Sequence, residues 1–214
     1  MSIDLHIHST NSDGSNTVDE IINKSIELQL QAISITDHEY LTTVKPVEGL
    51  EVIPGVEISV GWETLDKENI FSGTHLLVYF ITEGSELNNH LEAIRTKKIQ
   101  RNYEIIDNLK SFGIEISKED LDSYETKVPG RPHIAELLVK SNYVKNIPEA
   151  FGKYLGNGKL QDINKHQEDI VKIIELAKSS NCLIFLAHPH TLMSDSIYSR
   201  NNNWINDKFF DLIS

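Results

Sequence analysis

The chain has 214 residues, of which 39% are hydrophobic and 24% charged, and this composition excludes disordered and collagen-like chains. Its formal net charge of −12 excludes a general electrostatic attraction to nucleic acid or anionic lipid, so no stable nucleic-acid complex is expected. A single cysteine excludes internal disulfides and multi-thiolate metal sites. The length fits one elaborated domain over residues 1–214 better than two full domains.

The apolar runs are too short for a membrane-spanning helix. The longest runs, 76–81 and 182–187, have about six residues each, whereas a bilayer requires about 20. No charged leader with an apolar segment precedes Ile3. The sequence therefore predicts a cytoplasmic protein without a membrane partner.

The first part of the chain predicts alternating strands and helices. Short runs rich in β-branched residues indicate five strands in all, at residues 3–8, 32–38, 52–57, 75–80 and 183–190. Between the first two, Thr17 and Glu20 have the spacing of a capping box, and an apolar stripe with helical spacing follows. This pattern predicts a βαβ unit with two parallel strands. Pro54-Gly55 indicates a turn or bulge before Glu57.

The middle of the chain predicts helices instead. The expected helices cover residues 87–112 with Gly113 as C-cap, 134–140, 148–155, about 167–179, and a last one at 204–213. Because strands resume only at residue 183, we interpret residues 88–165 as a helical insertion in an α/β domain. A basic cluster (Arg95, Lys97, Lys98 and Arg101) on the first of these helices is interpreted as a solvated face, with guidance of an RNA tail as the alternative.

Histidines at the strand ends are the strongest chemical signal. In His6-Ile7-His8, both imidazoles point to the same face of a strand, which makes a half-site for a divalent metal; a solvent-facing strand is the alternative. The polar turn that follows can return the carboxylate of Asp13 to the same place. His38 ends the parallel neighbouring strand, so it should lie beside the first pair.

Three more strands each add a candidate ligand. Glu57 is suited to bridging two cations, and His75 and His188 repeat the same placement at two further strands. Each of these residues alone could be a solvated or structural side chain. Together, nitrogen and oxygen ligands without sulfur predict Zn, Mn or Fe, with more than one ion.

Six motifs in family order resemble the PHP (polymerase and histidinol phosphatase) superfamily. They are Asp4-Leu5-His6-Ile7-His8 with Ser12-Asp13-Gly14, Ile35-Thr36-Asp37-His38, Pro54-Gly55-Val56-Glu57, Thr74-His75-Leu76, Gly130-Arg131-Pro132-His133, and Ala187-His188-Pro189. The chain looks most like the branch of stand-alone metal-dependent phosphoesterases, which includes nucleoside 3′,5′-bisphosphate phosphatases and 5′-to-3′ exoribonucleases.

The resemblance implies an α/β fold, a distorted (β/α)7 TIM-like barrel that is incomplete at the C-terminus and carries the helical insertion. It implies two or three divalent ions held by His6, His8, Asp13, His38, Glu57, His75 and His188. It also implies that Arg131 and His133 face the substrate phosphate, since guanidinium groups are good phosphate partners.

The expected activity is hydrolysis of a phosphate ester by a metal-activated water, with a nucleotide or a short 5′-phosphorylated RNA as substrate. One departure of this sequence from the family pattern favours an alternative function. Family members carry a Gly-Ser-Asp-x-His motif with two more ligands near their C-terminus, and these 214 residues lack it, as expected either of a fragment or of a shortened protein that has lost part of its site. The alternative function is therefore a catalytically weak or inactive module that binds metal and nucleotide.

Overall fold

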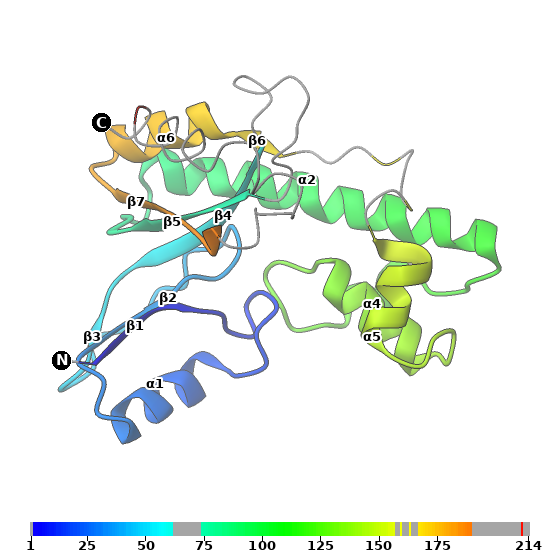
Figure 1. The fold of residues 1–214 in the computed structure, drawn as a ribbon, viewed down its shortest axis with the longest axis horizontal. Helices are drawn as coiled ribbons and strands as arrows, with labels where there is room; N and C mark the ends of the chain where they lie inside the picture. Colours follow the sequence, from blue (N-terminus) through cyan, green and yellow to red (C-terminus); the bar gives the residue numbers. More distant parts are fainter. Residues whose placement is uncertain are drawn as a thin grey trace, which may run out of the picture.

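A computed structural model describes residues 2–61, 74–156, 159, 163, 167–189 and 211 (Figure 1). Its elements in chain order are β1 (Ile3–Ile7), α1 (Val18–Glu27), β2 (Ala32–Ile35), β3 (Glu51–Val52), β4 (Gly55–Gly61), β5 (Thr74–Tyr79), α2 (Glu86–Leu109), η1 (Lys110–Phe112), α3 (Lys118–Asp122), α4 (Arg131–Lys140), α5 (Ile147–Ala150), η2 (Phe151–Leu155), β6 (Glu168–Asp169), α6 (Ile170–Ser179) and β7 (Leu183–Leu186).

The N-terminal sheet has the order β1-β2-β3, and all its strands are parallel. Helix α1 connects β1 to β2 and packs Ile21 against Ile33 and Ile35 of the sheet. Thr17 and Glu20 form the predicted capping box at the start of α1. The predicted βαβ unit is therefore confirmed.

The second sheet has the order β6-β4-β5-β7, with β5 antiparallel to both β4 and β7. The predicted third strand is wrong in its bounds: it divides at Pro54 into β3 and β4, and β4 continues past Glu57 to Gly61. Ile58 and Val60 explain the extension, because both are fully buried in the main core. Gly55 is required where β4 begins, since a Cβ there would lie 2.4 Å from Ser34 Oγ.

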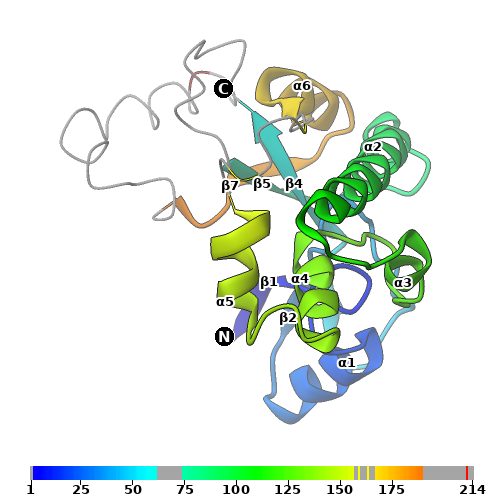
Figure 2. The same ribbon diagram turned by 90° about the vertical axis from the view of Figure 1, so that its right-hand side faces the viewer.

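Helix α2 connects two hydrophobic cores (Figure 1). Its first half packs Leu87, Leu91 and Ile94 with α6 against the second sheet. Its second half contributes Ile105 and Leu109 to a separate core with α3, α4, α5 and η2, the group of helices that faces the viewer in Figure 2. Gly113 ends this segment at φ 74°, as its predicted role as a C-cap requires.

Several predicted helix bounds differ from the structure. Helix α4 starts at Arg131 rather than at residue 134, because Pro132 is compatible with the first helical turn. The segment predicted as one helix from residue 148 is α5 followed by the π-helical η2. The last predicted helix, at 204–213, lies outside the described residues apart from residue 211.

The mixed α/β class is confirmed, whereas a closed barrel is not. The described strands form two sheets, and an isolated parallel bridge between His38 and Glu57 connects them. The proposed division into a PHP domain at 1–214 with an insertion at 88–165 stays a prediction. No described helix is both long enough and apolar enough to cross a membrane.

Candidate metal centre

The topology brings the candidate ligands to one edge of the two sheets. Strands β1 and β2 are parallel, so His8, directly after β1, lies near His38, three residues after β2. Backbone hydrogen bonds then pair this extension of β2 with β4: the Glu39 amide donates to Glu57 O at 2.9 Å, and the Glu57 amide donates to Asp37 O at 3.3 Å. The bridge places the Glu57 carboxylate among the histidines.

The antiparallel pairing of β4 with β5 explains why His75 begins its strand instead of ending it. Ser59 is paired with His75 and Glu57 with Leu77, so Glu57 and His75 are diagonal neighbours on one face. Strand β7 runs antiparallel to β5, and the chain beyond it returns to the same edge, where the Ala187 amide donates to His75 O at 2.9 Å. His188 follows directly, at a left-handed φ of 29°.

Glu57 is the centre of the cluster. Its side chain is only 1% exposed, and five imidazoles surround its carboxylate. The nitrogen–oxygen distances are 3.1 Å for His6 Nε2, 2.8 Å for His8 Nε2 and 3.6 Å for His38 Nδ1 to Oε2, and 2.9 Å for His75 Nδ1 and 2.8 Å for His188 Nε2 to Oε1.

Asp13 extends the cluster on the side of His8 and His38. Its carboxylate oxygens lie 3.4 Å from His8 Nδ1 and 3.6 Å from His38 Nε2. The interaction with His38 outweighs burial and lowers the pKa of Asp13 to about 2. All seven residues predicted as ligands are thereby joined in one cluster.

The surroundings of Glu57 favour the ionised form of its carboxylate. Burial acts to raise its pKa, but the surrounding imidazoles outweigh burial and hold that pKa far below the usual range for a glutamate. Burial likewise acts to lower the pKa of His38, yet the bond to Asp13 and the nearby carboxylates raise it above its ordinary value.

These residues fit divalent cations. Ligand atoms about 2.1 Å from a tetrahedral metal lie about 3.4 Å apart, close to the separations found around Glu57. Among the residues that the structure describes, three overlapping ligand groups are present: His6, His8 and Glu57; His8, Asp13 and His38; and His38, Glu57 and His75. His38 Nδ1 is also buried and has no hydrogen-bond partner in the described part of the chain; a nitrogen so placed can serve as a metal ligand.

The match to known proteins agrees with this geometry. The family model described as PHP domain matches residues 4–184. The chain belongs to the PHP domain family. The predicted resemblance is therefore confirmed.

Named relatives of this PHP domain act on nucleic acid or nucleotides. A 5′-3′ exoribonuclease of Haemophilus influenzae is 27% identical over 97% of this chain and 74% of its own length. The Escherichia coli 5′-3′ exoribonuclease Rnm is 28% identical over 87% of this chain and 64% of its own length. A 3′,5′-nucleoside bisphosphate phosphatase of Chromobacterium violaceum is 25% identical, with 88% and 67% covered. These relatives support the assignment of the chain as a hydrolase.

Solved structures share the fold. An amidohydrolase from Chromobacterium violaceum, solved with bound sulfate and no metal, has a TM-score of 0.77 at 24% identity and covers 94% of this chain and 72% of its own. A Bifidobacterium adolescentis protein has a TM-score of 0.71 at 22% identity, with 88% and 67% covered. The chain thus spans between about two thirds and three quarters of the length of these relatives.

Asp37 positions the first ligand turn of the PHP domain, a role that the sequence analysis did not assign. The Asp37 carboxylate is fully buried and accepts hydrogen bonds from the Ser9 amide at 2.7 Å, from Ser9 Oγ at 2.6 Å and from Ser12 Oγ at 2.6 Å. Thr42 Oγ1 donates to it as well. Asp37 therefore holds two segments together: the turn that contains Asp13, and the strand end that leads to His38.

Glu39 connects the same strand end to α2. Its buried carboxylate accepts a hydrogen bond from the Ser59 amide at 2.8 Å and pairs with Lys98 Nζ. Its carbonyl accepts a bond from Arg95 Nη1 at 2.8 Å, and the Arg95 guanidinium lies over the ring of Tyr40. The interpretation of the basic cluster as a solvated face is therefore wrong for Arg95 and Lys98, because both are paired beside the metal centre.

Arg131 and His133 lie on α4, and no hydrogen bond or ion pair of the described residues joins either to the seven candidate ligands. Arg131 Nη1 donates to Leu155 O at 3.1 Å. His133 is buried, and its Nδ1 accepts a hydrogen bond from the Gly130 amide at 3.0 Å. One nitrogen of His133 thus caps the helix, and its substrate role stays a prediction.

The remaining histidines were not predicted as ligands. His90 Nε2 lies 2.9 Å from a carboxylate oxygen of Glu168, in a network that also includes Lys97 and Lys172. This network connects α2, β6 and α6. His166 and His190 lie outside the described residues.

Proposed function

We propose that this PHP domain is a metal-dependent phosphoesterase that hydrolyses a phosphate ester of a nucleotide or of a 5′-phosphorylated oligonucleotide. The observation that carries the proposal is the convergence of five imidazoles on the buried carboxylate of Glu57. A structural ion pair would need one such partner, and five rings that compete for one carboxylate are instead typical of a site built around cations.

The cluster would hold two or three ions, with Mn, Zn or Fe as candidates. His6, His8, His75 and His188 would hold cations around Glu57, and Asp13 with His38 would hold one on the other side. Divalent cations bound there supply Lewis acidity, which activates water as the nucleophile and neutralises charge on the phosphoryl group. Their charge would also let an acidic protein bind an anionic substrate.

The residues of the chain have further roles in this reaction. The imidazoles around Glu57 hold its pKa far below the usual range, so its carboxylate would be available to hold cations. Asp37 and Glu39 hold the backbone on either side of His38, so the ligands are placed before the substrate arrives. Arg131 would orient the substrate phosphate.

The test uses metal-stripped protein with and without Mn²⁺. We expect release of phosphate from adenosine 3′,5′-bisphosphate, or of mononucleotides from a short 5′-phosphorylated RNA, only when metal is added. The ratio of the two rates would identify the better substrate. Absence of both products from folded, metal-loaded protein would contradict the proposal and favour a module that only binds metal and nucleotide.

A further inference from the structure

Asp13 is the candidate ligand that lies farthest from regular secondary structure. The other six lie on a strand or within three residues of the end of one. Asp13 lies in the turn between β1 and α1, six residues after Ile7, where β1 ends. Its side chain is 32% exposed, so packing alone does not hold it in place. Since loops position ligands less precisely than strands do, the place of its carboxylate depends on how this turn is anchored.

A segment distant in sequence anchors the turn. Residues 126–130, the connecting segment, lie between α3 and α4. The amides of Lys127 and Val128 in this segment donate to Asn11 O at 2.9 and 3.0 Å. The helical part of the chain is therefore hydrogen-bonded directly to the turn that carries Asp13.

Thr126 adds a side-chain anchor to these backbone contacts. Its Oγ1 donates to Asn11 O at 2.9 Å and to Ser12 O at 3.0 Å, across 115 and 114 residues of sequence. Ser12 is buried and directly precedes Asp13. Because a buried carbonyl needs a donor, the Thr126 hydroxyl fixes the peptide that leads into Asp13.

The turn is held from two sides. On one side, the Asp37 carboxylate accepts hydrogen bonds from Ser12 Oγ at 2.6 Å and from the Ser9 amide at 2.7 Å. On the other side, Thr126 donates to the backbone carbonyls. Asp37 follows β2 and Thr126 belongs to the helical part, so the turn is clamped between two separate parts of the fold.

The connecting segment is itself fixed in place. Val128 and Pro129 are buried. Asn102 of α2, which is also buried, donates from Nδ2 to Pro129 O at 2.6 Å. The Thr126 hydroxyl is therefore a donor on a rigid support rather than a freely moving surface group.

We propose that Thr126 is a positioning residue of the metal centre, whose hydroxyl fixes the turn so that the Asp13 carboxylate reaches the cation that His8 and His38 also bind. The inference rests on the proposed function only for the presence of divalent cations at the histidine cluster. Thr126 acts through Asp13 and the helical part of the chain thereby contributes to metal affinity. Loss of a partner behind a metal ligand typically weakens metal affinity about 10–100-fold.

Calorimetry of Mn²⁺ binding to metal-stripped protein tests the proposal. Thr126→Val keeps the shape of the side chain but removes the donor, so we expect the Kd to weaken about tenfold. Thr126→Ala removes the donor without placing a methyl group beside the two carbonyls, and should have the same effect. Thr126→Ser keeps the hydroxyl and should stay within threefold of wild type. Circular dichroism of the metal-free proteins checks that each variant is folded.

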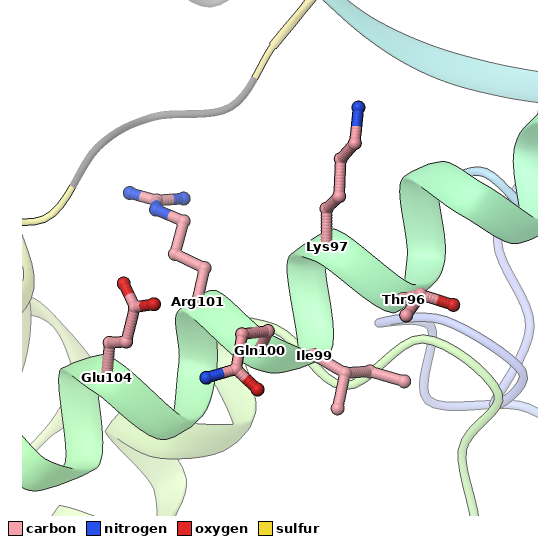
Figure 3. A pocket seen from close by; sticks show the side chains of 6 residues that line it. All are labelled: Thr96, Lys97, Ile99, Gln100, Arg101 and Glu104. Carbon is pink, nitrogen blue, oxygen red and sulfur yellow. The ribbon is translucent and has the colours of Figure 1, made fainter.

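Thr96→Val is the matched control. Thr96 lies on α2, where Figure 3 shows its side chain, and its hydroxyl donates to Glu92 O of the same helix at 3.0 Å. The same chemical change there should alter the Mn²⁺ Kd less than twofold. Equal Mn²⁺ affinities of wild type and Thr126→Val, equal losses in Thr126→Ser and Thr126→Val, or no Mn²⁺ binding by wild type would overturn the proposal.

A double variant shows whether Thr126 acts through Asp13. In an Asp13→Asn background, the Mn²⁺ bound by the remaining ligands should respond less than twofold to Thr126→Val, because the turn no longer supplies a charged ligand. A general loosening of the fold would instead weaken Mn²⁺ binding by the same factor in both backgrounds. That result would overturn the positioning role.

Turnover separates this inference from the proposed function. At saturating Mn²⁺, Thr126→Val should recover kcat for adenosine 3′,5′-bisphosphate to within threefold of wild type, since only its affinity for metal is changed. Mn²⁺ affinity that depends on Thr126, without hydrolysis by wild type, would refute the proposed function and leave the positioning role standing. Hydrolysis by wild type with a Mn²⁺ affinity that does not depend on Thr126 would do the reverse.

Discussion

At the scale of single residues, the metal centre depends on a few residues whose burial and close neighbours determine their roles. Glu57 is buried and ionised among imidazoles, although a carboxylate so deeply buried normally requires compensating cations. Gly14 has a steric role beside the same cluster. A Cβ at this position would lie 2.1 Å from the carbonyl oxygen of His8.

Glu57→Gln should abolish metal-dependent turnover. The substitution preserves shape but removes the negative charge that five imidazoles share, so we expect kcat/KM to fall at least about 100-fold and the number of bound ions to fall. Phosphate release and metal analysis after dialysis check this result. Glu51→Gln, at an exposed position of β3, is the control and should retain activity. Substantial activity of metal-replete Glu57→Gln would contradict the assigned role.

Gly14→Ala should weaken metal binding without touching a ligand. The added methyl group collides with backbone, which cannot move aside as a flexible side chain could, so the turn that carries Asp13 must shift. We expect at least tenfold weaker Mn²⁺ affinity by calorimetry. Gly152→Ala is the control, since a Cβ there meets nothing within 4 Å. Unchanged Mn²⁺ affinity in Gly14→Ala would show that Asp13 does not need this turn.

At the scale of elements, α2 is the part that joins the helical segment to the metal centre. It crosses both hydrophobic cores and contributes Arg95 and Lys98 to the backbone and carboxylate of Glu39. Glu39 is fully buried, and burial acts to raise its pKa, but Lys98 outweighs this and lowers the pKa. The ion pair is therefore required for Glu39 to remain charged inside the protein.

Lys98→Met should lower the free energy of unfolding by about 2–3 kcal/mol, because it leaves a buried carboxylate unpaired. Denaturant unfolding measures this loss. In the double variant Lys98→Met with Glu39→Leu, stability should recover partly, since both charges are removed. Lys110→Met is the control; Lys110 begins η1 directly after α2, and its ion pair with Asp107 is exposed to solvent and should contribute little to stability. A Lys98→Met protein as stable as wild type would show that the pair contributes nothing net.

At the scale of the whole molecule, ion pairs connect segments that are distant in sequence. Glu168 on β6 accepts from His90 and Lys97 of α2 and from Lys172 of α6. Burial acts to raise its pKa, but these hydrogen bonds outweigh burial and lower the pKa to about 2. Glu168 thereby holds together the two helices that cover the second sheet.

The acid stability of the protein should reflect this network. Since the pKa of Glu168 is lower in the folded chain than its ordinary value of 4.5, its contribution is complete above pH 4.5 and is lost as the pH falls toward 2. Because its lysine partners are about half exposed, we expect Glu168→Gln to cost only about 1 kcal/mol at pH 7. The difference from wild type, measured by urea unfolding, should shrink toward pH 2; a constant difference would contradict the assignment.

The sequence by itself determined the candidate ligands and the local elements of this protein. The H-x-H pair, the capping box at Thr17 and the cap at Gly113 follow from short-range rules, so they could be assigned without a structure. The β-branched runs predicted the strands for the same reason. The predicted strand bounds were wrong where packing decides them. One example is β4, which continues past Glu57 because Ile58 and Val60 are buried in the core.

Only the tertiary structure decided which side chains meet. Antiparallel pairing of β5 with β4 places His75 beside Glu57, and no local pattern specifies that pairing. Contacts with Glu39 distinguish Arg95 and Lys98 from the exposed Lys97, although all three look alike in sequence. The number of neighbours around a side chain is a property of the folded chain, and this is why the roles of Asp37 and Glu39 emerged from the structure alone.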